Sequence, residues 1–387
     1  MRKFLVVGLL LISTLPLMSC SSSDDEDVQS LPTPLVDFKP TLKLETLWEK
    51  GTSASVTHLF SRLQPAIGYD KVFVAGTEGI VEALSLDKGT KIWSINTGST
   101  IEAGVSVGSE MVIVGTRDGE IIALDQETGK ELWRNLLSSE ILSPAAIGEG
   151  FVVVRTEDGK LFGLDEKTGI RKWFFDRNVP ILTLRGTSTP VITRGVVISG
   201  FDNGKVALFL LSNGKPLWEK RIAQSTGRSE LERIVDMDAK PLVVDDKLYA
   251  VTYNGNIADI DIRSGKVIWQ RDMSSFQNID TDGLRLYVTS ADDEVKALSA
   301  TNGATFWNQN QLLNRKLTAP VSAGDYVVVG DYEGYIHWMD NKTGAFVARK
   351  HFTSSGISGN PVVRSNRMVV QGRNGDVLVL KVPESTY

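Results

Sequence analysis

Several residue types that build catalytic and metal-binding sites are scarce in this sequence. Its 387 residues include one cysteine and three histidines, so an internal disulfide is impossible and a histidine-based metal site is not expected. His58, His337 and His351 are far apart and form no metal-ligand pair at a useful spacing. HExxH, GxSxG and calcium-loop patterns are missing too. These patterns therefore give no sign of a metal site or of a hydrolase active site, and we expect no resident metal or cofactor.

Clusters of positive charge are missing as well. The chain has 42 basic and 47 acidic residues, a formal net charge of −5, and no basic run. Such a protein is not expected to bind nucleic acid, because that binding depends on lysine and arginine contacts with phosphates. The apolar stretch Phe4–Ile12 follows Arg2 and Lys3 and is too short to span a bilayer. It predicts an export signal instead.

The single cysteine lies where an export signal would be cut. Cys20 ends the stretch LPLMSC, which resembles a bacterial lipobox, where cleavage leaves an acylated, for example palmitoylated, cysteine at the new N-terminus. We expect residues 1–19 to be a lipoprotein signal peptide and residues 20–40, rich in Ser, Asp and Pro, to be a flexible lipidated tether. Ser21 stands where an aspartate would favour inner-membrane retention, so we expect the periplasmic face of the outer membrane. The alternative is an ordinary secretory signal with an incidental cysteine.

The remainder of the chain repeats one phrase eight times. In TRDGEIIALDQETGKELWRN, residues 116–135, one glycine ends an apolar run, another follows ten residues later, and a tryptophan comes four residues after that. The first turn falls at Gly79, Gly119, Gly159, Gly204, Gly255, Asp293, Gly334 and Gly375. The second falls at Gly89, Gly129, Gly169, Gly214, Gly265, Gly303 and Gly344. The last slot holds Trp93, Trp133, Trp173, Trp218, Trp269, Trp307 and, in the seventh copy, Ala348.

Each copy has the pattern of β-strands. Three short runs of β-branched and aromatic residues are separated by glycine-containing turns, and a run that begins with proline comes before most copies. Four antiparallel strands in about 40 residues predict a propeller blade, the alternative being tandem hairpins in a sandwich. The last copy stops after its third strand, and Trp48 lies in a lone strand before the first copy. We therefore predict an all-β, eight-bladed β-propeller over residues 41–384, closed by its N-terminal strand.

The repeated tryptophans have two interpretations. They could pack between neighbouring blades, or they could form a platform for a carbohydrate or cofactor. Their regular placement in almost every copy favours packing. Trp338, in the third strand of the seventh copy, is off the pattern, and we expect it to compensate for Ala348.

The repeat resembles that of the quinoprotein dehydrogenases. Those enzymes hold a pyrroloquinoline cofactor over the propeller channel, with calcium, a catalytic aspartate and, in many, a vicinal disulfide. This chain cannot form that disulfide and is considerably shorter, so the resemblance implies the fold and not the chemistry. A small quinoprotein-like oxidoreductase, or a sugar-binding periplasmic propeller, remains the alternative function.

Segments outside the repeat resemble a second family more closely. PILTLRGTSTP at 180–190, STGRSELERIVDMDAKP at 225–241, YNGN at 253–256 and GYIHW at 334–338 are similar to the BamB family, the lipoprotein B components of the bacterial β-barrel assembly machinery. This resemblance implies a non-enzymatic scaffold. Such a scaffold binds the periplasmic domains of the barrel-forming central subunit and assists the insertion of β-barrel proteins into the outer membrane.

Two consecutive blade connections are unusually long and are the candidate partner-binding loops. They run from Trp173 to Pro190 and from Trp218 to Pro241, although Trp48–Pro65 equals the first in length. Both connect an outer strand to the next inner strand, so we expect them to be neighbours on one face. Recognition commonly resides in such loops on a rigid scaffold.

The composition of these loops supports an interaction patch. The candidate residues are Leu182, Leu184 and Arg185 on the first loop and Asp236 and Asp238 on the second. The leucines could be apolar anchors and the charges an orienting ion pair, or the leucines could be buried while Arg185 pins the neighbouring loop. The BamB resemblance implies contact with the central subunit, with the aspartates able to act indirectly by holding Arg185. Unfolded barrel precursors could also add as a strand to a propeller edge, but the sequence identifies no such edge.

Overall fold

The computed structural model describes residues 31–58, 61, 63–180, 182–224, 229 and 232–384. Every regular element in this part of the chain is a β-strand. The predicted signal peptide, residues 1–19, and the predicted lipidation site, Cys20, lie outside the described residues.

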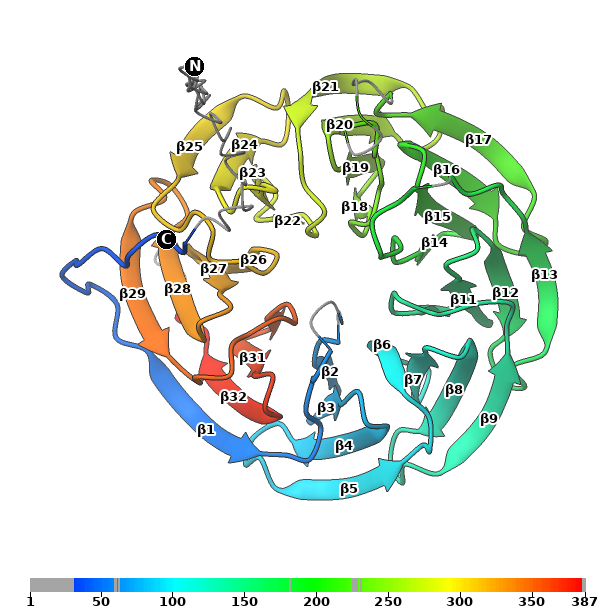
Figure 1. Cartoon of the computed structure of the whole chain (residues 1–387), viewed down its shortest axis with the longest axis horizontal. Coiled ribbons are helices and arrows are strands. Elements are labelled where there is room, and N and C mark those ends of the chain that lie inside the picture. Colours follow the sequence, from blue (N-terminus) through cyan, green and yellow to red (C-terminus); the bar gives the residue numbers. More distant parts are fainter. Residues whose placement is uncertain are drawn as a thin grey trace, which may run out of the picture. The chain divides into compact units, whose positions relative to one another are not determined.

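The strands form eight four-stranded antiparallel sheets, arranged as the blades of a ring (Figure 1). The first four blades are β2 (Ala66–Gly68), β3 (Lys71–Ala75), β4 (Ile80–Ser85) and β5 (Lys91–Asn96); β6 (Ile101–Gly108), β7 (Met111–Thr116), β8 (Glu120–Asp125) and β9 (Glu131–Leu136); β10 (Ala146–Gly148), β11 (Phe151–Arg155), β12 (Leu161–Asp165) and β13 (Arg171–Phe175); and β14 (Val191–Thr193), β15 (Val196–Phe201), β16 (Lys205–Leu210) and β17 (Pro216–Arg221). The next three are β18 (Leu242–Val244), β19 (Lys247–Val251), β20 (Gly255–Asp261) and β21 (Val267–Met273); β22 (Asp280–Thr281), β23 (Arg285–Thr289), β24 (Val295–Ser299) and β25 (Thr305–Gln309); and β26 (Val321–Ala323), β27 (Tyr326–Gly330), β28 (Tyr335–Asp340) and β29 (Phe346–His351).

The eighth blade joins the two ends of the chain. It contains β30 (Val362–Arg364), β31 (Arg367–Gln371), β32 (Asp376–Lys381) and, as its outer strand, β1 (Glu45–Gly51). Trp48 of β1 lies opposite Val379 of β32. The prediction of an all-β, eight-bladed propeller sealed by its N-terminal strand is therefore confirmed.

Strand composition follows position within the blade. The second and third strands are short runs of Val, Ile, Leu and Ala that are buried almost throughout, as in MVIVGT of β7. They are covered on both faces because each blade stacks against its two neighbours. Outer strands such as β9, ELWRNL, bury mainly the tryptophan and expose the flanking residues. Alternation of buried and exposed side chains is therefore confined mainly to the outer strand of each blade.

The tryptophans pack between blades, as expected. Gly129 has φ of 71°, and a Cβ placed on it would lie 2.7 Å from the ring of Trp93 in the preceding blade. The indole Nε1–H of Trp93 donates to the carbonyl of Gln126 at 3.0 Å. The glycine thus serves both the left-handed turn and the close approach of the indole. The same contact joins Trp48 to Gly89, Trp133 to Gly169, Trp173 to Gly214, Trp218 to Gly265, Trp269 to Gly303 and Trp307 to Gly344.

The missing tryptophan of the seventh copy follows from ring closure. Each indole packs on the turn between the third and fourth strands of the next blade. In blade 8 the fourth strand is β1, from the other end of the chain, so that turn does not exist. Ala348 occupies the slot, and Trp338 lies directly opposite it across β28 and β29, fully buried. This agrees with the expectation that Trp338 fills the space.

The chain packs on the propeller earlier than we predicted. We expected a flexible tether over residues 20–40. Instead, Thr33 donates its N–H to the carbonyl of Leu313 at 3.0 Å, and the ring of Phe38 stacks on Phe346 at 5.5 Å between centroids. The stretch from Thr33 is therefore part of the folded body, because its backbone and its aromatic side chain have partners on the propeller.

Candidate partner-binding loops

The inner strands surround a cavity of about 650 Å³ at the centre of the ring. Residues from all eight blades line it, among them Gln64, Arg185, Asp238, Lys240 and Asn360. Its wall is mixed in polarity. In the part of the chain that the structure describes, no group of three or more His, Cys, Asp or Glu side chains could hold a metal ion.

The two long connections are neighbours, as predicted. The first follows β13 and runs to β14, and the second follows β17 and runs to β18. The backbone N–H of Leu184 donates to Oδ2 of Asp236, and the hydroxyl of Ser188 donates to the carbonyl of Ala239 at 2.9 Å. The first loop is thus held at Leu184 by a carboxyl oxygen from the second loop.

Two of the candidate residues on the first loop face solvent. Leu182 is 42% exposed, and Leu184 is partly buried. The side chain of Arg185 is 42% exposed, and its guanidinium pairs with Glu140 at 3.0 Å. Glu140 belongs to the connection between β9 and β10, so three consecutive connections meet here. The leucines are therefore not both hidden in the blade interface.

The aspartates have a different position. Asp236 and Asp238 are only 1% and 2% exposed. They therefore lie beneath the loop surface. The indirect role expected for the aspartates was to hold Arg185; the structure shows Asp236 bound to the backbone of Leu184, while the ion pair of Arg185 is with Glu140. Asp238 lines the central cavity together with Arg185.

A buried layer of charge lies below the loops. The guanidinium of Arg155, fully buried, donates to both carboxylate oxygens of Asp202 at 2.7 Å. It also stacks on the ring of Phe201, 4.8 Å from its centroid. The guanidinium of Arg177 covers the same ring at 4.4 Å. These contacts bind blade 3 to blade 4 directly under the first loop.

Carboxyl groups in this layer titrate far from their usual range. Burial raises the pKa of Asp236 to about 8; the N–H of Leu184 opposes the rise, while the charges of Asp238 and Asp202 add to it. Burial, with the charges of Asp202 and Asp238, also raises the pKa of Glu157 to about 8. Both groups are therefore largely protonated at neutral pH, which keeps repulsion between the carboxyls low.

Sequence reasoning missed Glu140, Glu157 and the Arg155–Asp202 pair. Arg155 was the detectable signal, because it is a charged residue at the end of an otherwise apolar strand, FVVVR. A buried charge there requires a partner from a neighbouring blade. Glu140 gave no signal, because nothing in its local sequence differs from a solvated loop carboxylate.

The fold places the chain in a broad structural class, the eight-bladed β-propellers. Quinohemoprotein alcohol dehydrogenase from Comamonas testosteroni superimposes with a TM-score of 0.70 over 89% of this chain and 77% of that chain. Identity is 14%, so this likeness concerns the fold alone. No helix in the described ranges is long and apolar enough to cross a membrane.

Sequence comparisons identify the family. The family model described as outer membrane protein assembly factor BamB matches residues 77–309 and 291–383. The proteins of that name from Kangiella koreensis and Escherichia coli K12 are 44% and 36% identical, over 98% and 97% of this chain and 97% and 98% of their own lengths. The crystal structure of BamB from Moraxella catarrhalis has a TM-score of 0.81, 30% identity, and covers 88% of this chain and 100% of that chain. The chain belongs to the BamB family.

Proposed function

We propose that this protein is a non-enzymatic scaffold of the outer-membrane β-barrel assembly machinery. It binds the periplasmic domains of the barrel-forming central subunit and assists the insertion of barrel proteins. Family membership supports the general role, and one structural observation supports the site. Leu182 and Arg185 are exposed on a loop whose backbone is tied from beneath by Asp236.

The physical basis of binding is a pre-ordered loop. A loop that is fixed before it meets its partner loses little conformational entropy on binding. Leu182, with the partly buried Leu184 beside it, supplies apolar anchors, and Arg185 supplies a forked donor for a partner carboxylate. The Arg185 side chain is 42% exposed while it pairs with Glu140 through Nη2, and a guanidinium has five N–H donors, so further donors are available to a partner.

Membrane attachment completes the proposal. We place the mature protein on the periplasmic face of the outer membrane, anchored by acyl chains on Cys20. Each buried CH₂ of such a chain contributes about 0.8 kcal/mol, and one chain alone gives only marginal binding, so more than one acyl chain is needed.

A binding assay with purified periplasmic domains of the central subunit tests the loop assignment. We expect Leu182→Ala with Leu184→Ala, and separately Arg185→Glu, to weaken binding at least about tenfold, as loss of a central anchor does. The matched control is Leu132→Ala, which removes a leucine that is 48% exposed on the outer strand β9, away from the loops. Unchanged binding in both loop variants, with unaltered circular dichroism, contradicts the assignment.

A further inference from the structure

The segment from Pro32 to Leu42 lies along the outer edge of blade 7. At one end, Thr33 donates its N–H to the carbonyl of Leu313. At the other, the N–H groups of Thr41 and Leu42 donate to the carbonyl of Val347 in β29, at 2.9 and 3.1 Å. The segment therefore runs antiparallel to β29 before the chain turns into β1.

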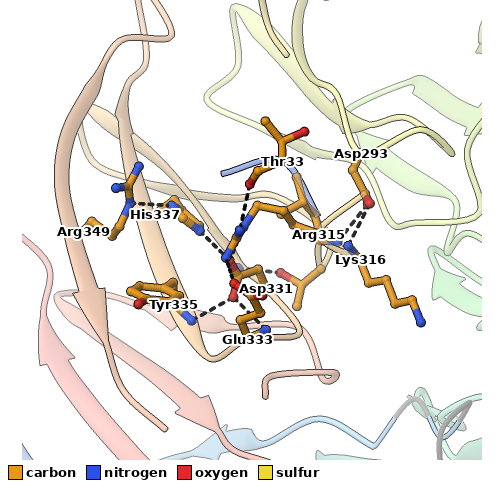
Figure 2. A network of polar contacts seen from close by, with 12 residues as sticks. Thr33, Asp293, Arg315, Lys316, Asp331, Glu333, Tyr335, His337 and Arg349 are labelled. Carbon is orange, nitrogen blue, oxygen red and sulfur yellow. Dashed lines mark hydrogen bonds and ion pairs between the residues drawn. The ribbon is translucent and has the colours of Figure 1, made fainter. Parts of the chain in front are cut away.

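Two arginines of the propeller hold the backbone of this segment. Arg315 donates from Nη1 to the carbonyl of Thr33 at 2.9 Å, as Figure 2 shows. Arg349 donates from Nη1 to the carbonyl of Val36, also at 2.9 Å. Two fixed cationic donors on successive stretches of one extended backbone make a clamp, since charge-assisted hydrogen bonds are stronger than neutral ones.

Apolar contacts reinforce the clamp. Leu35 packs against the cluster that contains Trp307, Leu312 and Leu317. The guanidinium of Arg349 lies 5.0 Å from the centroid of Phe38 and 5.3 Å from that of Phe346, so it covers both stacked rings. Every second or third residue of the segment thus has a partner on the propeller.

The clamp arginines are themselves fixed by a buried network (Figure 2). Oδ2 of Asp331 accepts from Nε of Arg315 at 2.8 Å and from Nε2 of His337 at 2.9 Å. Nδ1 of His337 accepts from Nε of Arg349 at 3.2 Å, so the imidazole is neutral and links the two arginines through Asp331. Arg315 is 2% exposed, and Asp331 and His337 are fully buried. Buried ion pairs are stable only when their geometry is good and their other hydrogen bonds are satisfied. The network therefore holds the guanidinium groups that donate to Thr33 and Val36 in fixed positions.

The segment begins on the face that carries the candidate partner-binding loops. Leu313 lies in the connection from β25 to β26, which is of the same outer-to-inner type as those loops. Contacts around the ring place these connections and the starts of the inner strands together on one face. The hydrogen bonds join Gln64 to Gly104, Ser143 to Thr187, Ser188 to Ala239, Lys240 to Asn278, Gln277 to Leu317, Ala319 to Asn360 and Asn360 to Gln64.

We propose that residues 32–42 are a docked stem that fixes where the membrane tether leaves the propeller, so that the loop face is held toward the lipid surface. This rests on the anchor at Cys20 given under the proposed function. From Cys20 to Pro32 an extended chain reaches at most about 40 Å, whereas an undocked tether to Glu45 would reach about 90 Å. Docking of the stem therefore roughly halves the distance that the tether can span, and it makes the tether leave the propeller from the loop face.

Hydrogen exchange tests docking without the membrane. The mature chain from Ser21 keeps the whole compact unit that begins at Pro32. We expect Leu35→Ser with Phe38→Ser to speed exchange of the amides of Thr33, Thr41 and Leu42 at least tenfold, with blade amides unchanged. Leu31→Ser is the matched control, because Leu31 is 83% exposed. Equal protection in the double variant overturns the docked stem.

Energy transfer to a lipid surface tests orientation. The mature chain, with a histidine tag before Ser21, is attached to nickel-chelating phosphatidylcholine vesicles that contain an acceptor dye. A donor is placed through Asp118→Cys, in the turn between β7 and β8 on the loop face, or through Lys167→Cys, in the turn between β12 and β13 on the opposite face. We expect more transfer from position 118, and loss of the difference when the stem carries both serines.

Equal transfer from the two positions in the docked protein overturns the orientation. Because the tag replaces the lipid and no partner is present, this result is independent of acylation at Cys20 and of partner binding. Failure of the stem is thereby distinguishable from failure of the proposed function.

Discussion

The backbone N–H of Leu184 donates to a carboxylate oxygen of Asp236, 52 residues further along the chain and across a blade boundary. One residue belongs to the proposed contact surface and the other is almost fully buried. Because a buried carboxyl group supports the surface loop, the conformation of the loop depends on whether that carboxyl is charged. This dependence can be measured.

The first prediction concerns pH. The carboxyl of Asp236 keeps its proton up to about pH 8 in the folded protein, whereas in the unfolded chain it loses the proton near pH 4. Between these values the folded state binds more protons, so its stability falls as pH rises from about 4 to about 8 and then levels off. The fall is at most about 1.4 kcal/mol per pH unit for one group.

Asp236→Asn should flatten this slope, because the amide cannot ionise yet retains an oxygen that accepts from Leu184. The measurement is urea denaturation at pH 5, 6, 7 and 8. Glu157→Gln should flatten it as well, since its pKa is also raised to about 8. Asp118→Asn, at an exposed turn, is the control. An Asp236→Asn slope equal to that of the unchanged protein would show that this carboxyl does not titrate as described.

The second prediction concerns the turn glycines. Gly129→Ala combines a left-handed backbone, φ 71°, with a contact of 2.7 Å to the Trp93 ring, and it should destabilise the protein by about 3 kcal/mol. Gly98 has a similar φ of 76°, but a Cβ there would meet no described residue within 4 Å, so Gly98→Ala should lose only about 1 kcal/mol. Chemical denaturation of the two variants separates packing from backbone strain. Equal losses would mean that indole packing on the turn contributes nothing.

Much of this architecture could be predicted from the sequence because it repeats. The Gly-to-Trp spacing records a contact made once per blade, so Trp93 and Gly129 predicted a packing position before their partners were known. Ring closure was predictable for the same reason. Trp48 occupies the tryptophan position of a blade whose other three strands lie at the opposite end of the sequence. Loop length also predicted the two connections that meet at Leu184 and Asp236.

Features that occur once were not predictable in this way. The salt bridge from Arg185 to Glu140 joins residues 45 apart through loops whose paths depend on the whole ring. The docking of Thr33 and Phe38 depends on a clamp built from β29 and the connection before β26. The local composition of this segment predicts a flexible chain, and it is ordered only because of its contacts with distant parts of the propeller.

The third prediction concerns Trp338. It is fully buried opposite Ala348, and Trp338→Ala should destabilise the protein by about 3–5 kcal/mol, as large core truncations do. Its Nε1–H has no hydrogen-bond partner among the residues that the structure describes, so Trp338→Phe should be much milder. Trp133→Phe is the informative comparison, because that indole donates to the carbonyl of Glu166 at 3.0 Å. Thermal unfolding should rank Trp338→Phe above Trp133→Phe, and the reverse order contradicts this account of the orphan indole.

The last prediction separates two roles for Arg185. If its only task is to tie its loop to Glu140, exchanging the charges in Arg185→Glu with Glu140→Arg restores the ion pair and should restore binding of the central subunit's periplasmic domains. If the guanidinium itself contacts a partner carboxylate, the exchange repairs the loop but leaves a repulsive charge at the interface. We expect the second result: hydrogen exchange of residues 182–186 returns to that of the unchanged protein, while the dissociation constant remains at least about tenfold weaker. Full recovery of binding in the exchanged protein would make Arg185 a positioning residue and leave the two leucines as the contact.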